Sequence, residues 1–91
     1  MPKVNNLQLL AKLANIARLE GAPLDEVLAQ LEIDFAEYVA AIKPLVTLEP
    51  EDVIAQLQTR FPDIALALNN PLAERVVRKI QDYLIRKGST L

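Results

Sequence analysis

Two stretches of the sequence, DEVLAQLEIDFAEYVAAIKP at residues 25–44 and EDVIAQLQTRFPDIALALNN at residues 51–70, are rough copies of each other. At an offset of 26 residues, six of the 20 aligned positions are identical, including Phe35 and Phe61. A repeat at a fixed offset identifies the structural unit of a fold. Each copy has the pattern of a short helix, a turn and a second short helix, and we expect Phe35 and Phe61 to anchor the two hairpins in the core.

The rest of the chain is also patterned as short helices. Asn, Pro, Asp and Gly provide start and stop signals for about six segments. The expected helices cover residues 6–20, 23–31, 34–42, 50–61, 63–68 and 71–87. The expected caps are Asn5 or Asn6, Asp34, Asp63 and Asn70, and Gly21 and Gly88 are expected to end the first and last helices. Residues 32–34 are expected to form the turn of the first hairpin. No stretch alternates as a strand does.

These patterns predict an all-α fold, a compact orthogonal bundle of about six short helices that contains two similar helix-turn-helix hairpins. The 91 residues form one domain over positions 1–91, near the lower end of the lengths that fold alone. With 52% hydrophobic residues, the composition is that of a folded chain. The longest apolar run, Ile64 to Leu68, is far shorter than the roughly 20 residues of a membrane span. With no signal-peptide pattern, we expect a cytoplasmic protein that does not enter a membrane.

The composition argues against an enzyme. The chain has no Cys and no His, so it lacks thiol chemistry, the commonest metal ligand and the commonest general base. Its single serine, Ser89, has no histidine to activate it. The two glycines are isolated, so no glycine-rich loop is available to hold a phosphate. We therefore predict no catalytic residue, no cofactor and no metal site.

The apolar surface favours protein–protein interaction. On a helical wheel, the apolar arc of residues 6–20 covers about half of the circumference, so this helix should pack on more than one neighbour or lie in a subunit interface. Ile85 falls outside the apolar face of the last helix, and exposed apolar patches usually mark partner surfaces. We predict an interaction module that self-associates as a homodimer or larger homo-oligomer. The candidate contacts are Leu9, Leu13, Ile16, Ile80 and Ile85.

The alternative is a nucleic-acid-binding protein. Residues 24–43, LDEVLAQLEIDFAEYVAAIK, resemble a DNA-binding helix-turn-helix, which would imply a transcriptional regulator. The segment that corresponds to the recognition helix, residues 34–42, has two acids and no base, whereas DNA affinity depends on cationic contacts to phosphate. The usual turn glycine is replaced by Glu32.

The last helix provides a second candidate surface for nucleic acid or for an acidic partner. The overall net charge is −2, yet residues 71–91 have five bases and two acids. The basic residues are Arg75, Arg78, Lys79, Arg86 and Lys87. The other interpretation is a solvated helix face whose last-turn cations interact favourably with the helix dipole.

Overall fold

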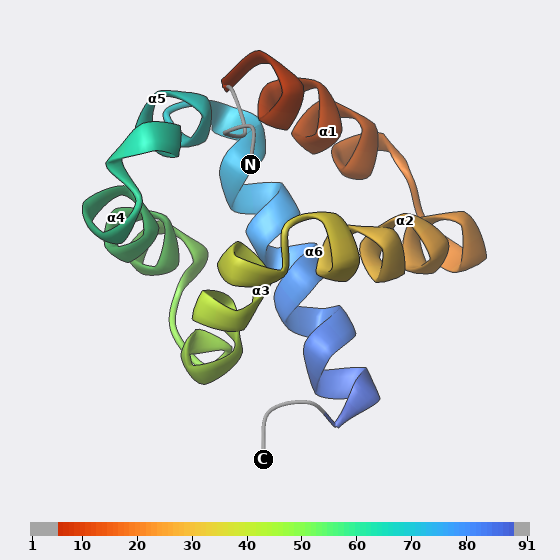
Figure 1. Cartoon of the computed structure of the whole chain (residues 1–91). Coiled ribbons are helices and arrows are strands. Elements are labelled where there is room, and N and C mark those ends of the chain that lie inside the picture. The colour runs from red at the N-terminus through yellow and green to blue at the C-terminus, as the bar shows by residue number, and fades with distance from the viewer. Residues whose placement is uncertain (1–5, 89–91) are drawn as a thin grey trace.

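A computed structural model of the chain describes residues 6–88, and these residues contain six α-helices, two 3-10 helices and no strand (Figure 1). The elements are α1 (Asn6–Arg18), α2 (Gly21–Asp34), α3 (Ala36–Ile42), η1 (Lys43–Leu45), α4 (Pro50–Arg60), η2 (Pro62–Ile64), α5 (Ala65–Leu68) and α6 (Pro71–Lys87). The molecule measures 29 × 28 × 24 Å along its principal axes. The predicted all-α class is confirmed.

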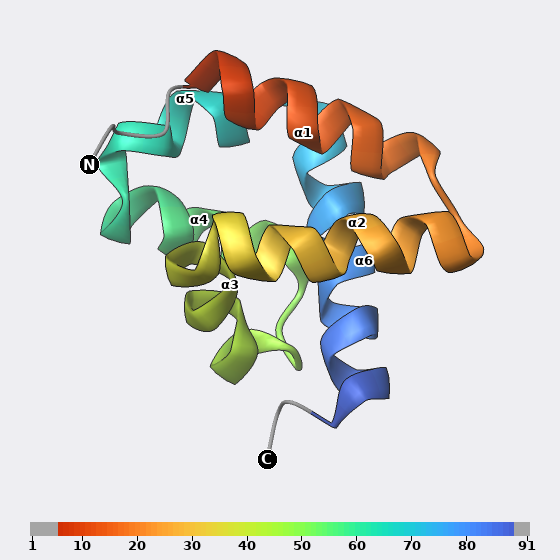
Figure 2. The same cartoon turned by 45° about the vertical axis from the view of Figure 1, so that its right-hand side comes forward.

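Helix α6 runs through the middle of the molecule and packs against α1, α2 and α4 (Figures 1 and 2). Its start and end are as predicted from the sequence. The Asn70 side chain accepts a hydrogen bond of 2.8 Å from the Leu72 N–H, and Pro71 takes the first helical position. The helix ends at Gly88, which has a φ of 71°, in the left-handed region that glycine adopts without strain. The central place of α6 follows from its long apolar face, whose buried residues are Ala73, Val76, Val77, Ile80, Tyr83 and Leu84.

The predicted boundaries in the first third of the chain are wrong. Helix α1 ends at Arg18, and Gly21 begins α2 instead of ending the first helix. Helix α2 then continues through residues 32–34, where a turn was expected. No Gly or Pro interrupts this stretch, so nothing stops the helix before Phe35. Asp34 therefore lies inside α2, where it accepts a hydrogen bond from Gln30, and it does not cap α3.

Asp63 does not cap the fifth helix as expected. Asp63 lies within η2, and its side chain makes no capping hydrogen bond to α5. Asn5, the alternative cap of the first helix, lies outside the described residues.

The two sequence copies share their turning point and then diverge. At Phe35 and Phe61 the φ angles are −127° and −126°, and the ψ angles are 42° and 73°. Each Phe N–H donates to the carbonyl of the leucine four residues earlier, at 2.8 Å for Phe35 and 2.7 Å for Phe61. The first copy continues as α3, whereas Pro62 starts the second on the short η2 and the four-residue α5.

An aromatic cluster connects the two turning points. The Tyr38 ring lies 6.2 Å from the Phe35 ring in a stacked arrangement and 4.7 Å from the Phe61 ring, edge to face. Both phenylalanines are partly buried and pack against the hydrophobic core. The two copies are therefore joined through Tyr38, a residue that the repeat does not duplicate.

One buried polar side chain fixes the connection between the copies. Gln81 on α6 is 2% exposed, and its Nε2 donates to the carbonyls of Leu45 at 3.0 Å and Leu48 at 2.9 Å. Both carbonyls belong to the segment between α3 and α4. Because a buried amide without partners is costly, this pairing stabilises one path for the segment.

Candidate interaction surfaces

Four of the five predicted interface residues lie in the core, so their prediction as contacts is corrected. Leu9, Leu13 and Ile80 are each 5% exposed, and Ile16 is fully buried. They are buried because α1 packs against both α5 and α6. Ile85 is 51% exposed, as its position outside the apolar face of α6 indicated.

The wide apolar arc of α1 has a second half that remains exposed. Leu7 is 79% exposed and Leu10 is 40% exposed, and Ala11 and Ala14 are exposed beside them. These residues recur at three- and four-residue spacing and so form one stripe along the helix. We call Leu7, Leu10, Ala11 and Ala14 the α1 stripe. The arc width in the sequence signalled this surface, but sequence reasoning selected residues from the buried half.

The α1 stripe lies on a helix that is anchored at its start. The Asn6 Nδ2 donates to the Asp63 carbonyl at 3.1 Å, and the Asn6 Oδ1 accepts from the Ala67 N–H at 3.0 Å. These bonds hold the first turn of α1 against η2 and α5. Leu66, the residue before Ala67, is 74% exposed and adds to the apolar surface at this end of the molecule.

The end of α1 is held by Lys79, one of the predicted nucleic-acid contacts. Its Nζ donates to the carbonyls of Ile16 at 3.2 Å, Ala17 at 2.9 Å and Leu19 at 2.7 Å. The last carbonyls of a helix lack hydrogen-bond donors within the helix and form the negative pole of its dipole. A cation at this position donates hydrogen bonds to these carbonyls and interacts favourably with the dipole. The ammonium group of Lys79 is thus committed to α1.

Three other cations of α6 pair with acids in the same chain. The Arg86 guanidinium contacts both carboxylate oxygens of Asp25, at 3.1 and 3.2 Å. The Lys87 Nζ lies 2.7 Å from the Glu32 carboxylate, so both C-terminal cations bind α2. Arg78 forms a looser, exposed pair with Glu49 at 3.5 Å. The basic helix therefore faces acids of its own chain, which the sequence asymmetry alone does not reveal.

The ion pair between Lys87 and Glu32 also lowers the pKa of Glu32. The hydrogen bond from Lys87 is the main cause that lowers the pKa of Glu32, with a smaller contribution from the Tyr83 hydroxyl. Burial is the main cause that raises the pKa of Tyr83.

Arg75, the fifth predicted cation, is exposed and has no ion-pair partner within residues 6–88.

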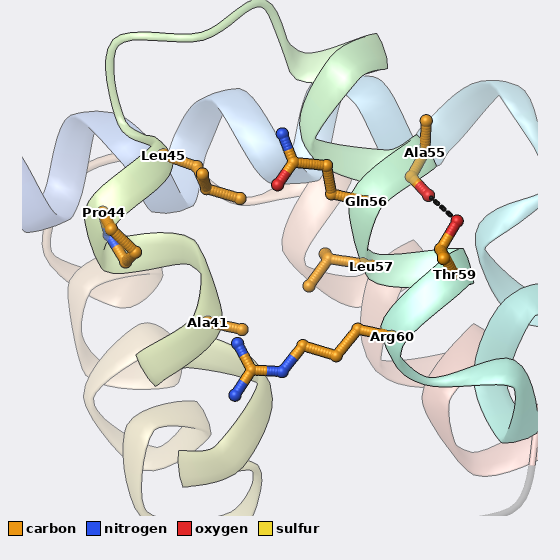
Figure 3. Close-up of a pocket in the computed structure, with 8 residues that line it drawn as sticks. All are labelled: Ala41, Pro44, Leu45, Ala55, Gln56, Leu57, Thr59 and Arg60. Carbon is orange, nitrogen blue, oxygen red and sulfur yellow. Dashed lines mark hydrogen bonds between the residues drawn. The ribbon is translucent and has the colours of Figure 1, made fainter.

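A groove of about 480 Å³ lies between α3–η1 on one side and α4 on the other (Figure 3). It is lined by Ala41, Pro44, Leu45, Ala55, Gln56, Leu57, Thr59 and Arg60. Arg60 extends from α4 toward Ala41 on the opposite wall. No acidic residue lines this groove. The sequence analysis did not select it, because its residues come from both copies and from Leu45 between them, and they meet only in the folded chain.

Residues 6–88 contain neither a cluster of metal-ligand side chains nor a helix that could span a membrane. No three His, Cys, Asp or Glu side chains within residues 6–88 gather as metal ligands would. Among the helices of this segment, none combines the length and the apolar character that crossing a bilayer requires. Ser89, the single serine, lies outside the described residues.

Comparison of the chain with models of protein families, with curated proteins and with solved structures found no match. The function of the candidate surfaces therefore has to be inferred from the residues that form them. The α1 stripe and the α3–α4 groove are both apolar and accessible, whereas four of the five cations on α6 are paired within the chain.

Proposed function

We propose that this protein is a small, non-enzymatic interaction module that self-associates through the α1 stripe. The observation that carries the proposal is the exposure of Leu7 and Leu10 on a helix that is anchored at both ends. A rigid apolar surface of this kind is favourable for binding, because little conformational freedom is lost when a partner covers it.

The spacing of the α1 stripe suits a second copy of the same chain. When two α1 helices pair antiparallel about a twofold axis midway between residues 10 and 11, Leu7 faces Ala14 of the partner and Leu10 faces its Ala11. Each large side chain then meets a small one, which is the arrangement that lets two helices approach to the usual 8–10 Å. No charged residue belongs to the stripe, so the pairing buries no unpaired charge.

We expect pairing through the α1 stripe to give a weak dimer. Burying one exposed leucine contributes about 1.5–3 kcal/mol, and four leucines lie in the twofold interface. This gain is of the same order as the roughly 4–15 kcal/mol that association costs in lost freedom of motion. The dimer should therefore form and dissociate within an accessible range of protein concentration.

Sedimentation equilibrium over a wide concentration range tests the proposal. We expect the mass of the wild-type chain to rise with concentration and the mass of Leu7→Glu to stay at one chain. Ala29→Glu introduces the same charge at an exposed position of α2 and serves as the control, which should behave like wild type. A wild-type mass of one chain at every concentration would refute self-association.

The nucleic-acid alternative has less support. Lys79, Arg86 and Lys87 are engaged by hydrogen bonds within the chain, and α3 bears Glu37 but no basic residue. Binding DNA through α6 would require these contacts to be exchanged for phosphate contacts, which lowers the net gain.

A further inference from the structure

The groove between α3–η1 and α4 forms a second surface, separate from the α1 stripe. We propose that it binds an amphipathic helix of another protein, one that carries an acidic residue beside its apolar stripe. The inference concerns a different partner and a different face from the proposed self-association, so each stands without the other.

The floor of the groove fits apolar side chains. Pro44, Leu45 and Ala55 provide the apolar groups that a partner can reach, whereas Leu57 and Ala41, 3% and 5% exposed, lie beneath them. Figure 3 shows Leu57 pointing from α4 toward α3 and η1. The small Ala55 leaves room for a partner backbone to come close, while Pro44 and the partly buried Leu45 offer apolar area to cover. A helix presents its anchors at i, i+3 or i+4 and i+7, so its apolar stripe can lie against the groove between the two helices.

The charge at the groove selects an acidic partner. Arg60 is exposed, extends toward Ala41, and forms no ion pair with any residue in positions 6–88. Its guanidinium lies 5.3 Å from the centre of the Phe61 ring, and this contact helps to orient the side chain. Glu37, one turn before Ala41 on α3, makes no ion pair with Arg60 either. The donors of Arg60 are therefore available to a carboxylate of the partner, and two N–H groups can bind it together.

The groove is preformed. Gln81 holds the carbonyls of Leu45 and Leu48, and Pro44 restricts the backbone of the same wall. On the α4 wall, the Thr59 hydroxyl donates to the Ala55 carbonyl at 3.1 Å, so this polar group is already satisfied (Figure 3). A preformed site loses less conformational entropy on binding, which favours affinity.

Nuclear magnetic resonance titration of the isotope-labelled full chain tests the proposal. The probes are three synthetic 15-residue helical peptides. The acidic peptide has leucine at i, i+3 and i+7 with glutamate beside the stripe. The basic peptide has lysine in place of that glutamate, and the polar peptide has serine in place of the leucines. We expect the acidic peptide to shift the amide signals of residues 41–45 and 55–60, and to bind about tenfold more tightly than the basic one.

Charge reversal at the groove sharpens the test. Arg60→Glu should reverse the preference, so that the basic peptide binds better, and Arg60→Gln should abolish the preference. Arg75→Glu, which changes an exposed cation of α6, should leave all three affinities unchanged. The proposal fails if the peptides shift signals elsewhere, such as those of the α1 stripe, or shift none. It also fails if the polar peptide binds as well as the acidic one, or if the Arg60 variants keep the wild-type preference.

Discussion

Replacing Lys79 by Met should destabilise the fold strongly, although Lys79 looks like an ordinary surface cation in the sequence. Its Nζ donates to three carbonyls at the end of α1, at 2.7 to 3.2 Å. Met keeps a similar apolar stem and a similar helix propensity, so the substitution removes mainly the ammonium group. The variant leaves the three carbonyls without this donor and leaves the negative pole of α1 without its cation.

The expected loss follows from two contributions. Hydrogen bonds to a charged group contribute about 1.5–3 kcal/mol each in favourable cases, and a cation at a helix end contributes about 0.3–1 kcal/mol. Lys79 is only partly buried, so water replaces some of what is lost. We therefore expect the free energy of unfolding to fall by about 2 kcal/mol in total. For a chain of this size, that lowers Tm by roughly 8–16 °C.

Urea unfolding followed by circular dichroism measures this change, and Arg75→Met provides a matched control. Arg75 lies on the same helix and is exposed, so its substitution should change the free energy of unfolding by less than about 0.5 kcal/mol. The m-value of both variants should equal that of wild type, because the surface exposed on unfolding is the same. If Lys79→Met is as stable as Arg75→Met, Lys79 does not hold α1 and our account of the basic helix is wrong.

Three further predictions concern the core, the acid response and DNA. Gln81→Leu removes the buried amide that donates to the carbonyls of Leu45 and Leu48, of which only Leu45 keeps another donor, the Leu48 N–H. It should lower the free energy of unfolding by about 2 kcal/mol in a urea titration. The pKa of Glu32 is lowered from its ordinary value of 4.5, so its ionised form stabilises the fold above about pH 4.5 and this contribution disappears as the pH falls through the lower folded value. The stability difference between wild type and Glu32→Gln should therefore shrink in unfolding curves below pH 4.5. Duplex DNA at low salt should show no binding in fluorescence anisotropy, and a steeply salt-dependent complex would instead support the nucleic-acid alternative.

The sequence was a good guide to the limits of α6, but not to the helix limits expected at Gly21, Asp34 and Asp63. Asn70, Pro71 and Gly88 set the limits of α6 through capping and backbone preference, which act within a few residues. At residues 32–34 the repeat suggested a turn, but the local signals there do not break a helix, and α2 continues to Asp34. The repeat marked Phe35 and Phe61 as equivalent positions just after a turn, but the first turn lies at Phe35 itself and the structures that follow the two residues differ.

The candidate surfaces were less predictable, because they depend on which elements become neighbours. The width of the apolar arc of α1 was visible in the sequence, yet which half is buried depends on the positions of α5 and α6. The cations of α6 were visible too, but the partners of Lys79, Arg86 and Lys87 lie 55 to 63 residues away. They are carbonyls at the end of α1 for Lys79 and acids on α2 for Arg86 and Lys87. These contacts hold α1 and α2 against α6.

These contacts couple the stability of the chain to its proposed self-association. Helix α1 is held by Asn6 at its start and by Lys79 at its end, and the α1 stripe lies between these two points. A dimer that binds only the folded chain stabilises it by mass action, so the Tm of the wild-type protein should rise with protein concentration. Leu7→Glu should remove that dependence, because it removes the contact while leaving both anchors of α1 in place. Lys79→Met should instead lower Tm at every concentration, and should also weaken the dimer if the end of α1 loosens. Scanning calorimetry of both variants over a hundredfold range of concentration separates the two effects. A wild-type Tm that does not change over that range would show that the α1 stripe is not a self-association surface.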